Sequence, residues 1–493
     1  MRFLLPTGAI TEPVVAAIAA QFNADVVVTG KIASFLQPKQ LAAILERIDQ
    51  KKHGSHPCYD GVFVSGMCTA TFEDVEAEFG IPIYRGPLHA ADLAMILSYA
   101  DAGFTFSRTI PADQLLALER EKEAYKTLSI VEEKANPLCY LREIAIGGRA
   151  RMKVLAEIMD AHRVTDLHAV ITSYVLSGAD IIDLGFGFDA TPDDVYTVFS
   201  QVKGILTDLK ASGTHVACAI DTQDPMLITA ALSSSCLDLV LSLHEGNISC
   251  APLLQSHGVC AVIVPGEAGL EKNMQAAQDM GITCIADPVL HPIGSGLLSS
   301  IAQIYNVHIN HPEWPLFFGA GNVIELIDAD SIGIVATLAG IAHEAGAGII
   351  FVSEHSDKTK GVIAEMRRAT EMMALLGERP YPKDLGIDLL VMKEKRARRE
   401  PPLRYDEVRE LAPPAHLIYD PKGNFRIGIA DDAIWVERGG VAISGAQWDA
   451  LFRTIENYGW VSRLDHAAYL GKELYKAELA LRFKRSFEQD GSF

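Results

Sequence analysis

The sequence predicts an α/β protein: a central (β/α)8 TIM barrel with an amino-terminal α/β domain and a small carboxy-terminal α+β domain. Three observations predict this. The chain has 493 residues, 49% of them hydrophobic, which is enough for two to four domains with sizeable cores. Between residues 150 and 370, short apolar runs alternate with helical stretches. Most of these runs are followed directly by an acidic or other polar residue, as strands that lead into a functional face are.

The central segment contains eight apolar runs that have the length of buried parallel strands. They are Lys153–Met159, Ile181–Gly185, Val216–Ile220, Leu237–Leu243, Val259–Val264, Thr283–Ala286, Leu316–Gly319 and Ile349–Val352. Eight βα units in about 210 residues match the size of a TIM barrel. A doubly wound sheet is the rival arrangement, but it usually has fewer strands and a glycine fingerprint after the first.

Residues 1–130 predict a smaller α/β domain. Four apolar runs suit parallel strands, and amphipathic stretches between them suit helices. The strands are expected at Arg2–Leu5, Ala24–Val28, Gly61–Val64 and Ile81–Tyr84, and the helices at Glu12–Gln21 and Pro38–Gln50. A charged helix over Pro111–Lys134 is expected to lead into the barrel. The domain has no phosphate-loop pattern, so no chemistry is assigned to it.

Residues 385–493 predict the carboxy-terminal domain, which begins with a basic linker, Lys393–Pro402. A small antiparallel meander and two helices are expected to follow, with turn chemistry at Asp420-Pro421-Lys422-Gly423. The expected strands are Leu417–Asp420, Phe425–Ala430 and Ala433–Glu437, and the expected helices are Ala446–Asn457 and Ala467–Phe487.

The composition of the chain argues against some classes of binding partner and predicts its location. The formal net charge of −20 repels phosphate backbones, which argues against nucleic acid. No apolar stretch reaches the roughly 18 residues of a membrane span. The eight cysteines are scattered, often inside apolar runs, which is typical of reduced thiols and predicts a cytoplasmic protein. His53, His56 and Cys58 form a His-x-x-His-x-Cys run, but no second cluster completes it, so no residue is assigned to a metal.

The chemistry of a (β/α)8 barrel lies at the carboxyl ends of its strands. There the sequence places Glu157, Asp160, Asp183, Asp189, Asp221, Ser242, Asp287, Asn322, Ser356, Lys358 and Lys360. A single acidic residue after a strand is often only a helix cap. Carboxylates converging from several strands repel one another, so they predict either a ligand with several N–H donors or a divalent metal.

Three of these segments resemble a known family. Gly178–Gly185, Ala219–Thr222 and Asp287-Pro288 look like pterin-binding motifs of the dihydropteroate synthase superfamily. Nearly the whole chain resembles a dihydropteroate synthase-like family of archaea and methylotrophic bacteria that is associated with tetrahydromethanopterin biosynthesis and one-carbon metabolism. The supporting runs are residues 86–93, 319–331, 353–360 and 462–474.

The resemblance implies a transferase. It would condense a dihydropterin-methyl diphosphate with ribofuranosylaminobenzene 5′-phosphate and release pyrophosphate, with Mg²⁺ brought by the diphosphate and no permanently bound cofactor. Asp221 and Asp287 would be the catalytic residues. Ser356, Lys358 and Lys360 would bind phosphate, and a homodimer is compatible with the family. The pterin would contact Glu157, Asp160, Asp183, Asp189, Asp221, Ser242, Asp287 and Asn322.

Two departures from ordinary dihydropteroate synthases keep alternatives open. Those enzymes have Ser-Arg-Lys after strand seven and Arg-x-His after strand eight, where this chain has Gly321-Asn322-Val323 and Glu354-His355-Ser356. The run Gly319–Val323 instead resembles pterin-dependent corrinoid methyltransferases. The alternatives are therefore a pterin-dependent methyltransferase that acts with a corrinoid protein, and a non-catalytic pterin-binding or scaffold protein.

Overall fold

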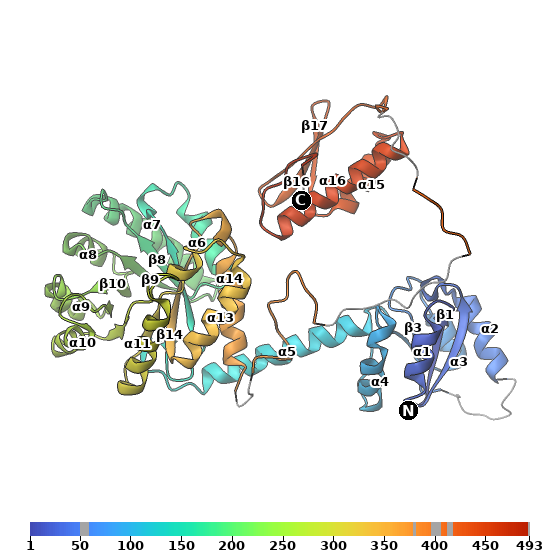
Figure 1. Ribbon diagram of the computed structural model, residues 1–493, viewed down its shortest axis with the longest axis horizontal. Coiled ribbons are helices and arrows are strands. Elements are labelled where there is room, and N and C mark those ends of the chain that lie inside the picture. Colours follow the sequence, from blue (N-terminus) through green and yellow to red (C-terminus); the bar gives the residue numbers. More distant parts are fainter. Residues whose placement is uncertain (50–58, 378–380, 396–405, 412–417, 492–493) are drawn as a thin grey trace. The chain divides into compact units, whose positions relative to one another are not determined.

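The computed structural model describes residues 1–49, 59–377, 381–395, 406–411 and 418–491 (Figure 1). The chain divides into two compact units. The first comprises Met1–Asn136, Gly148–Arg151 and Arg368–Val408, and the second comprises Pro137–Gly147, Met152–Arg367 and Arg409–Phe493. The basic linker Lys393–Pro402 lies largely outside the described residues.

The amino-terminal domain is built on a parallel four-stranded sheet in the order β2-β1-β3-β4. Its strands are β1 (Phe3–Gly8), β2 (Ala24–Gly30), β3 (Gly61–Val64) and β4 (Ile83–Arg85). Its helices are α1 (Glu12–Ala19), α2 (Pro38–Asp49), α3 (Glu73–Phe79) and α4 (Leu93–Asp101), followed by the long α5 (Ala112–Glu133).

The side chains of β1 pack alternately on the two faces of this sheet. Phe3 and Leu5 pack with α1 and α4 in one core cluster, whereas Leu4 packs with α2 and α3 in the other. Alternating side chains of a strand point to opposite faces, so a strand buried on both faces is a continuous apolar run. This is why β1 and β3, which are buried along their whole length, could be predicted from apolar runs alone.

The central domain is a closed barrel of eight parallel strands, as predicted. The strands are β7 (Lys153–Ile158), β8 (Ile181–Gly185), β9 (Ala217–Asp221), β10 (Leu239–Leu243), β11 (Cys260–Ile263), β12 (Cys284–Ala286), β13 (Leu316–Phe318) and β14 (Ala347–Ser353). The ring closes where β14 pairs with β7. Each predicted run contains or overlaps its strand within one or two residues, which is the usual scatter of element ends.

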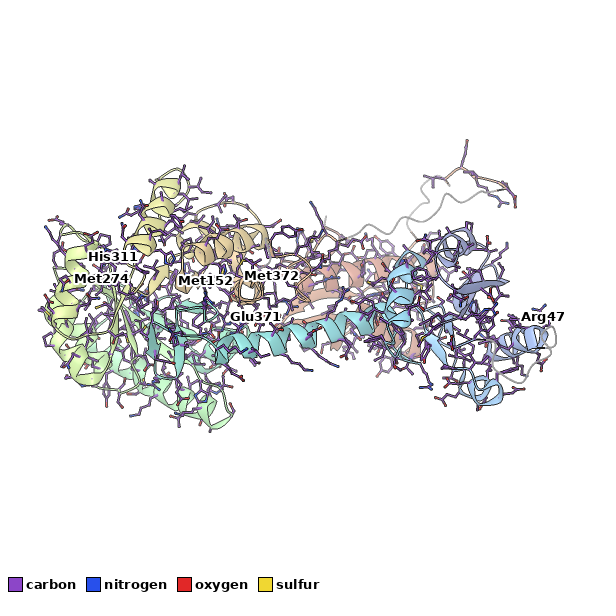
Figure 2. The ribbon with its side chains drawn as sticks, turned by 90° about the horizontal axis from the view of Figure 1, so that it is seen from below. Arg47, Met152, Met274, His311, Glu371 and Met372 are labelled. Atoms are coloured by element: carbon purple, nitrogen blue, oxygen red, sulfur yellow. The ribbon has the colours of Figure 1, made fainter. Side chains whose placement is uncertain are left out.

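Helices follow every barrel strand. They are α6 (Leu167–Leu176), α7 (Pro192–Ala211), α8 (Pro225–Leu232), α9 (Ala251–His257), α10 (Leu270–Asp279), α11 (Leu297–Asn310), α13 (Ser331–Glu344) and α14 (Val362–Ala374), with the short α12 (Gly321–Ile324) before α13. His311, which follows α11, lies 3.7 Å from Glu271 of α10; His311 and Met274 of the same helix are both labelled in Figure 2. Met274 is fully buried, and His311 stacks on Trp314 with ring centroids 3.7 Å apart.

A short hairpin that was not predicted closes the amino-terminal end of the barrel. It consists of β5 (Cys139–Leu141) and β6 (Ile144–Ile146). Leu141 and Ile146 belong to the same core cluster as the inward-facing residues of the lower barrel layers. Gly348 of β14 makes this approach feasible, because a Cβ there would lie 2.8 Å from the Gly147 nitrogen and from the Ile146 side chain.

The carboxy-terminal domain pairs an antiparallel sheet with two helices. Its elements are β15 (Arg426–Ala430), β16 (Ala433–Arg438), β17 (Val441–Gly445), α15 (Trp448–Asn457) and α16 (Leu464–Arg482). The predicted strand at Leu417–Asp420 is wrong: Ile418–Asp420 is not a strand, and Leu417 lies outside the described residues. Asp420 instead accepts backbone hydrogen bonds from Ser462 and Arg463, which hold this segment as a loop.

In the part of the chain that the structure describes, no helix combines the length and the apolar character that crossing a bilayer requires.

The hairpin yields a stability prediction. Ile146→Ala should lower the free energy of unfolding of the barrel by about 3 kcal/mol, because it leaves a cavity in a fully buried site. Denaturant unfolding of the full chain measures this change. Tyr140→Ala on the same hairpin is the matched control, since this side chain is 56% exposed and should change the value by about 0.5 kcal/mol or less. Equal effects of the two substitutions would contradict a plugging role.

Candidate functional site

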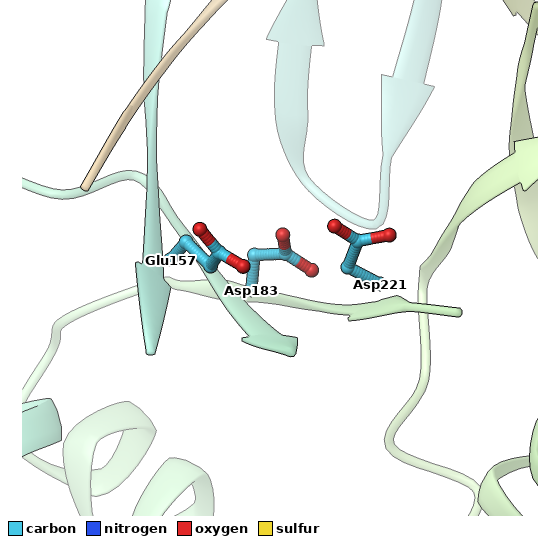
Figure 3. A group of neighbouring side chains, drawn as sticks. All are labelled: Glu157, Asp183 and Asp221. Atoms are coloured by element: carbon cyan, nitrogen blue, oxygen red, sulfur yellow. The ribbon is translucent and has the colours of Figure 1, made fainter. Parts of the chain in front are cut away.

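Three carboxylates converge at the carboxyl ends of neighbouring barrel strands: Glu157 on β7, Asp183 on β8 and Asp221 on β9 (Figure 3). One oxygen of each lies within 4.8 Å of the others. We call this set the carboxylate trio. Strand register explains it: Glu157 pairs with Asp183, and Asp221 pairs with Gly185, so Asp221 lies one layer nearer the barrel mouth than Asp183.

Gly185 gives the Glu157 carboxylate its place in the trio. A Cβ on Gly185 would lie 2.7 Å from Glu157 Oε1, which is closer than real Cβ contacts come. Any larger residue at position 185 would therefore displace this carboxylate. The resemblance treated Gly185 only as part of a motif, and the structure gives it this steric role.

The trio accumulates negative charge in a poorly solvated place. Burial, followed by repulsion from Asp221, raises the pKa of Glu157 to about 8. Burial and repulsion from both neighbours raise the pKa of Asp183 well above its usual range, and burial raises that of Asp221 to about 6. Near neutral pH the trio therefore retains protons unless a positive group joins it.

Two polar groups at the trio are buried without a partner. Asp183 is fully buried, and neither of its carboxylate oxygens has a hydrogen-bond partner within the described residues. The same holds for Ser353 Oγ on β14. Ser353 pairs with Glu157 across the strands, so both side chains point into the barrel. Buried polar groups are normally hydrogen-bonded, so these atoms favour a bound ligand or ion.

Asp287 and Asn322 lie on the other side of the mouth. Asp287 follows β12, which stands opposite β8 in the ring, and Asn322 follows β13. The Val289 amide donates to Asp287 Oδ1 at 2.8 Å, and Asn322 Nδ2 donates to the Leu290 carbonyl at 2.9 Å. Burial raises the pKa of Asp287 to about 7, against the lowering effect of the Val289 bond.

Ser242 is the penultimate residue of β10, a strand that lies between the trio and Asp287 in the ring. Its carbonyl accepts a hydrogen bond from Asn247 Nδ2 at 3.0 Å, and Asn247 also bonds the Gln223 carbonyl and the His244 amide. Asn247 is buried and fixes the loop that follows β10. Ser242 is thus part of the rim, in a position set by backbone contacts.

Asp160 and Asp189 do not join the trio. They lie on the rim with Arg163, which hydrogen-bonds Asp189 and lies 3.9 Å from Asp160. Contact of both with the pterin stays a prediction, and the structure gives them Arg163 as a neighbour. Sequence reasoning missed Arg163, although it stands three residues after Asp160.

Phe188, in the loop after β8, is a second residue that sequence reasoning missed. Its side chain is fully exposed, which is unusual for an aromatic ring. The spacing Gly185-Phe186-Gly187-Phe188 was the available signal. An exposed ring at a barrel mouth can stack on a flat ligand.

The predicted phosphate-binding residues lie in the loop after β14. Lys358 Nζ forms an ion pair with Asp328 at 2.9 Å, and Lys360 Nζ with Asp357 at 2.7 Å. Both carboxylate partners are almost fully exposed. Exposed ion pairs contribute little stability, so a phosphate could replace these partners at low cost. Ser356 caps the short turn Asp357–Thr359 through Thr359.

The trio is also the set of residues that could hold a metal. Carboxylate oxygens suit Mg²⁺, and the unpartnered oxygens of Asp183 fit a cation that satisfies them. The sequence assigned no protein ligand to a metal. His53, His56 and Cys58 lie outside the described residues.

Similarity to a known family lies in the carboxy-terminal domain, where residues 419–490 match the family model described as PterinBD-DUF4346. Similarity to a known protein extends over nearly the whole chain. The chain is 29% identical over 531 aligned positions to "Uncharacterized protein MJ0107" from Methanocaldococcus jannaschii, and the match covers 99% of this chain and 98% of that protein.

Two solved structures are also similar to this chain. One is titled "Structure of Mycobacterium tuberculosis Rv1207", with 19% identity, a TM-score of 0.36, and coverage of 48% of this chain and 97% of that one. The other is a dihydropteroate synthase from Thermus thermophilus in complex with 6HMPPP, with 18% identity, a TM-score of 0.36, and coverage of 45% and 93%. At this level, the likeness carries no argument about function.

The trio predicts a cation site. Mg²⁺ titrated into the full chain at pH 8 should give saturable heat from one site per chain in a calorimeter. Asp183→Asn should weaken it about tenfold or more, because the most buried ligand loses its charge. Glu245→Gln is the control: this carboxylate is held by Asn273 and the Glu267 amide and lies outside the trio. Unchanged binding in Asp183→Asn would remove the trio as the site.

Proposed function

We propose that the barrel binds a pterin at its mouth and acts as a dihydropteroate synthase-like transferase of tetrahydromethanopterin biosynthesis. The observation that carries the proposal is the placement of buried, proton-holding carboxylates on opposite sides of one barrel mouth, with Asp287 facing the trio. Two facts support it further: the motif resemblance at Asp221 and Asp287, and the name of the family matched by residues 419–490, which refers to a pterin-binding domain.

Asp287 would bind the 2-amino and N3 edge of the pterin. A carboxylate accepts two parallel N–H donors as it does from a guanidinium, and such charge-assisted pairs are strong. One oxygen already accepts the Val289 amide, which orients the group. Asp221, across the mouth, would orient the opposite side of the ring, and the exposed ring of Phe188 is available to stack on it.

The reaction would be a displacement at the exocyclic methylene carbon. The arylamine nitrogen, or a nearby ring carbon, attacks this carbon while its bond to the diphosphate oxygen breaks. Pyrophosphate leaves with the bonding electrons, and the attacking atom loses a proton. No side chain needs to act as a nucleophile, so the protein would contribute positioning and electrostatics.

The trio of Glu157, Asp183 and Asp221 fits Mg²⁺, which would neutralise charge on the diphosphate when bound. Lys358 and Lys360 would bind the phosphate of the arylamine after exchanging their exposed carboxylate partners. Mg²⁺ and these two lysines would together take the place of the cationic side chains that ordinary dihydropteroate synthases carry after strands seven and eight.

A single assay tests the reaction. The full chain is incubated with the dihydropterin-methyl diphosphate, ribofuranosylaminobenzene 5′-phosphate and Mg²⁺, and pyrophosphate is measured. Release that requires both substrates is expected, and Asp287→Asn should reduce it about 100-fold, since a charge-assisted pair is lost. Pterin binding without any pyrophosphate release would rule out the synthase.

The two alternatives give other outcomes. Methyl transfer from a methylated pterin to supplied cob(I)alamin would favour the corrinoid-linked methyltransferase. Full pathway function of Asp287→Ala in cells would favour a non-catalytic scaffold and count against both enzymes.

Pterin binding should depend on pH through Asp287. Its folded pKa of about 7 lies above the usual value, so the carboxylate becomes ionised only as the pH rises through 7. Affinity for a pterin should therefore fall about tenfold per unit below pH 7, because the protonated group accepts fewer hydrogen bonds. The free protein responds in the opposite sense: the stability contributed by the protonated group is lost as the pH rises through 7.

Fluorescence titration with a pterin between pH 5.5 and 8.5 measures the effect. Asp287→Asn should bind weakly and with a shallower pH profile, in which only the titration of Glu157 and Asp221 remains. The same slope in wild type and Asp287→Asn would assign the titration to another group.

A further inference from the structure

The amino-terminal domain contains a cavity of about 360 Å³. Its walls come from the carboxyl ends of the strands and the loops that follow them. Most of the lining residues lie within 5–11 at the end of β1 and beyond it, 31–34 after β2, 63–67 at the end of β3 and beyond it, and 86–91 after β4. Small-molecule sites usually start at about 300 Å³. The sequence assigned no chemistry to this domain, and the proposed function of the barrel does not use it.

The cavity lies where topology favours a ligand. In the order β2-β1-β3-β4, the chain leaves β1 toward β2 and then returns to build β3 on the other side of β1. The helices confirm the reversal, since α1 packs on one face of the sheet and α2 on the other. Loops separate at such a switch point, and open α/β sheets bind ligands in that crevice, outside the carboxyl ends of the strands.

The charge of the lining is the opposite of the charge of the chain. The chain carries Asp+Glu 63 against Lys+Arg 43, yet no aspartate or glutamate among the described residues lines this cavity. Lys31 does line it, and within the described residues its ammonium group has no hydrogen-bond or ion-pair partner. A positive wall without a carboxylate selects for an anion.

Hydroxyl groups supply further donors. Ser34 Oγ has no hydrogen-bond partner in the described part of the chain. Ser65 Oγ accepts the Met67 amide at 3.3 Å, which leaves its proton free to donate. His89 adds a ring nitrogen to the same cavity.

Apolar side chains form the rest of the wall and stay exposed to solvent. Ile10 is 38% exposed, Ile32 is 49% exposed and Met67 is 53% exposed. Exposed apolar side chains grouped around a hollow favour the burial of an apolar ligand body. The lining of the cavity thus combines a lysine and hydroxyl groups with exposed apolar side chains.

We propose that this cavity at the carboxyl ends of β1 and β3 is a second ligand site, which binds a small organic anion: an apolar or aromatic body on Ile10, Ile32 and Met67, and an anionic group on Lys31, Ser34 and Ser65. It is separate from the barrel and built by the amino-terminal domain alone.

Phenyl phosphate and benzoate are suitable probes, because each carries only the two recognised features, and benzyl alcohol is the uncharged comparison. Calorimetric titration of the full chain should give a Kd on the order of 1 mM or below for at least one anion, and about tenfold weaker binding of benzyl alcohol. Lys31→Met should weaken anion binding fivefold to tenfold. Lys39→Met, an exposed lysine on α2 outside the cavity, should leave it unchanged.

A second variant tests the location without removing charge. Ala91 lines the cavity and is exposed, so Ala91→Phe should fill the opening and abolish binding while the circular dichroism spectrum stays that of the wild type. The inference is overturned if neither anion binds up to about 10 mM, or if benzyl alcohol binds equally well. It is also overturned if Lys358→Met at the barrel mouth removes binding that Lys31→Met and Ala91→Phe leave intact.

Discussion

Electrostatic repulsion among buried carboxyl groups governs the centre of this barrel. Glu157, Asp183 and Asp221 stand on neighbouring strands, and no lysine, arginine or histidine among the described residues forms an ion pair with them. A buried carboxylate can be kept by protonation or by a positive partner. The raised pKa values of the three groups correspond to protonation. A bound cation or a ligand with several N–H donors would be the positive partner. The free barrel is therefore a proton-holding form of a site that suits a positively charged or donor-rich guest.

The exposed rim of the barrel mouth differs from the buried trio. Asp160 and Asp189 are also carboxylates, but Arg163 lies beside both, and the pKa of Asp189 lies below its usual range because Arg163 donates to it. The difference between rim and interior is burial together with the partner, not the residue type. Acidic residues at strand ends are thus candidates for ligand binding only where the protein leaves them uncompensated.

The fold was largely predictable because parallel strands buried on both faces are continuous apolar runs. The barrel strands and the acidic residues at their ends follow from this pattern. The hairpin of β5 and β6 did not, because its strands have three residues each and turn at Arg142, which adopts a positive φ of 52°. β17 was missed because most of its side chains are exposed, so it carries no clear apolar run.

The candidate site residues also fall into two groups: those that a single strand places, and those that the fold brings together from different loops. Glu157, Asp183, Asp221 and Asp287 were found because each lies within the last three residues of its own strand or directly follows it. The pairing of Arg163 with Asp189 joins two different loops, and the amino-terminal cavity joins four. Local sequence cannot show such meetings, because they arise only when the sheet brings distant turns to one edge.

The hairpin of β5 and β6 affects the order in which ligands can bind in the barrel and leave it. Because Leu141 and Ile146 fill its amino-terminal end, a ligand enters the described part of the barrel from the mouth. Asp183 lies one layer below Asp221, so whatever reaches Asp183 must first pass Asp221. A large ligand bound at the mouth would then block the dissociation of any ligand bound below it. A ligand that binds beside Asp183 would therefore bind before the ligand at the mouth and dissociate after it.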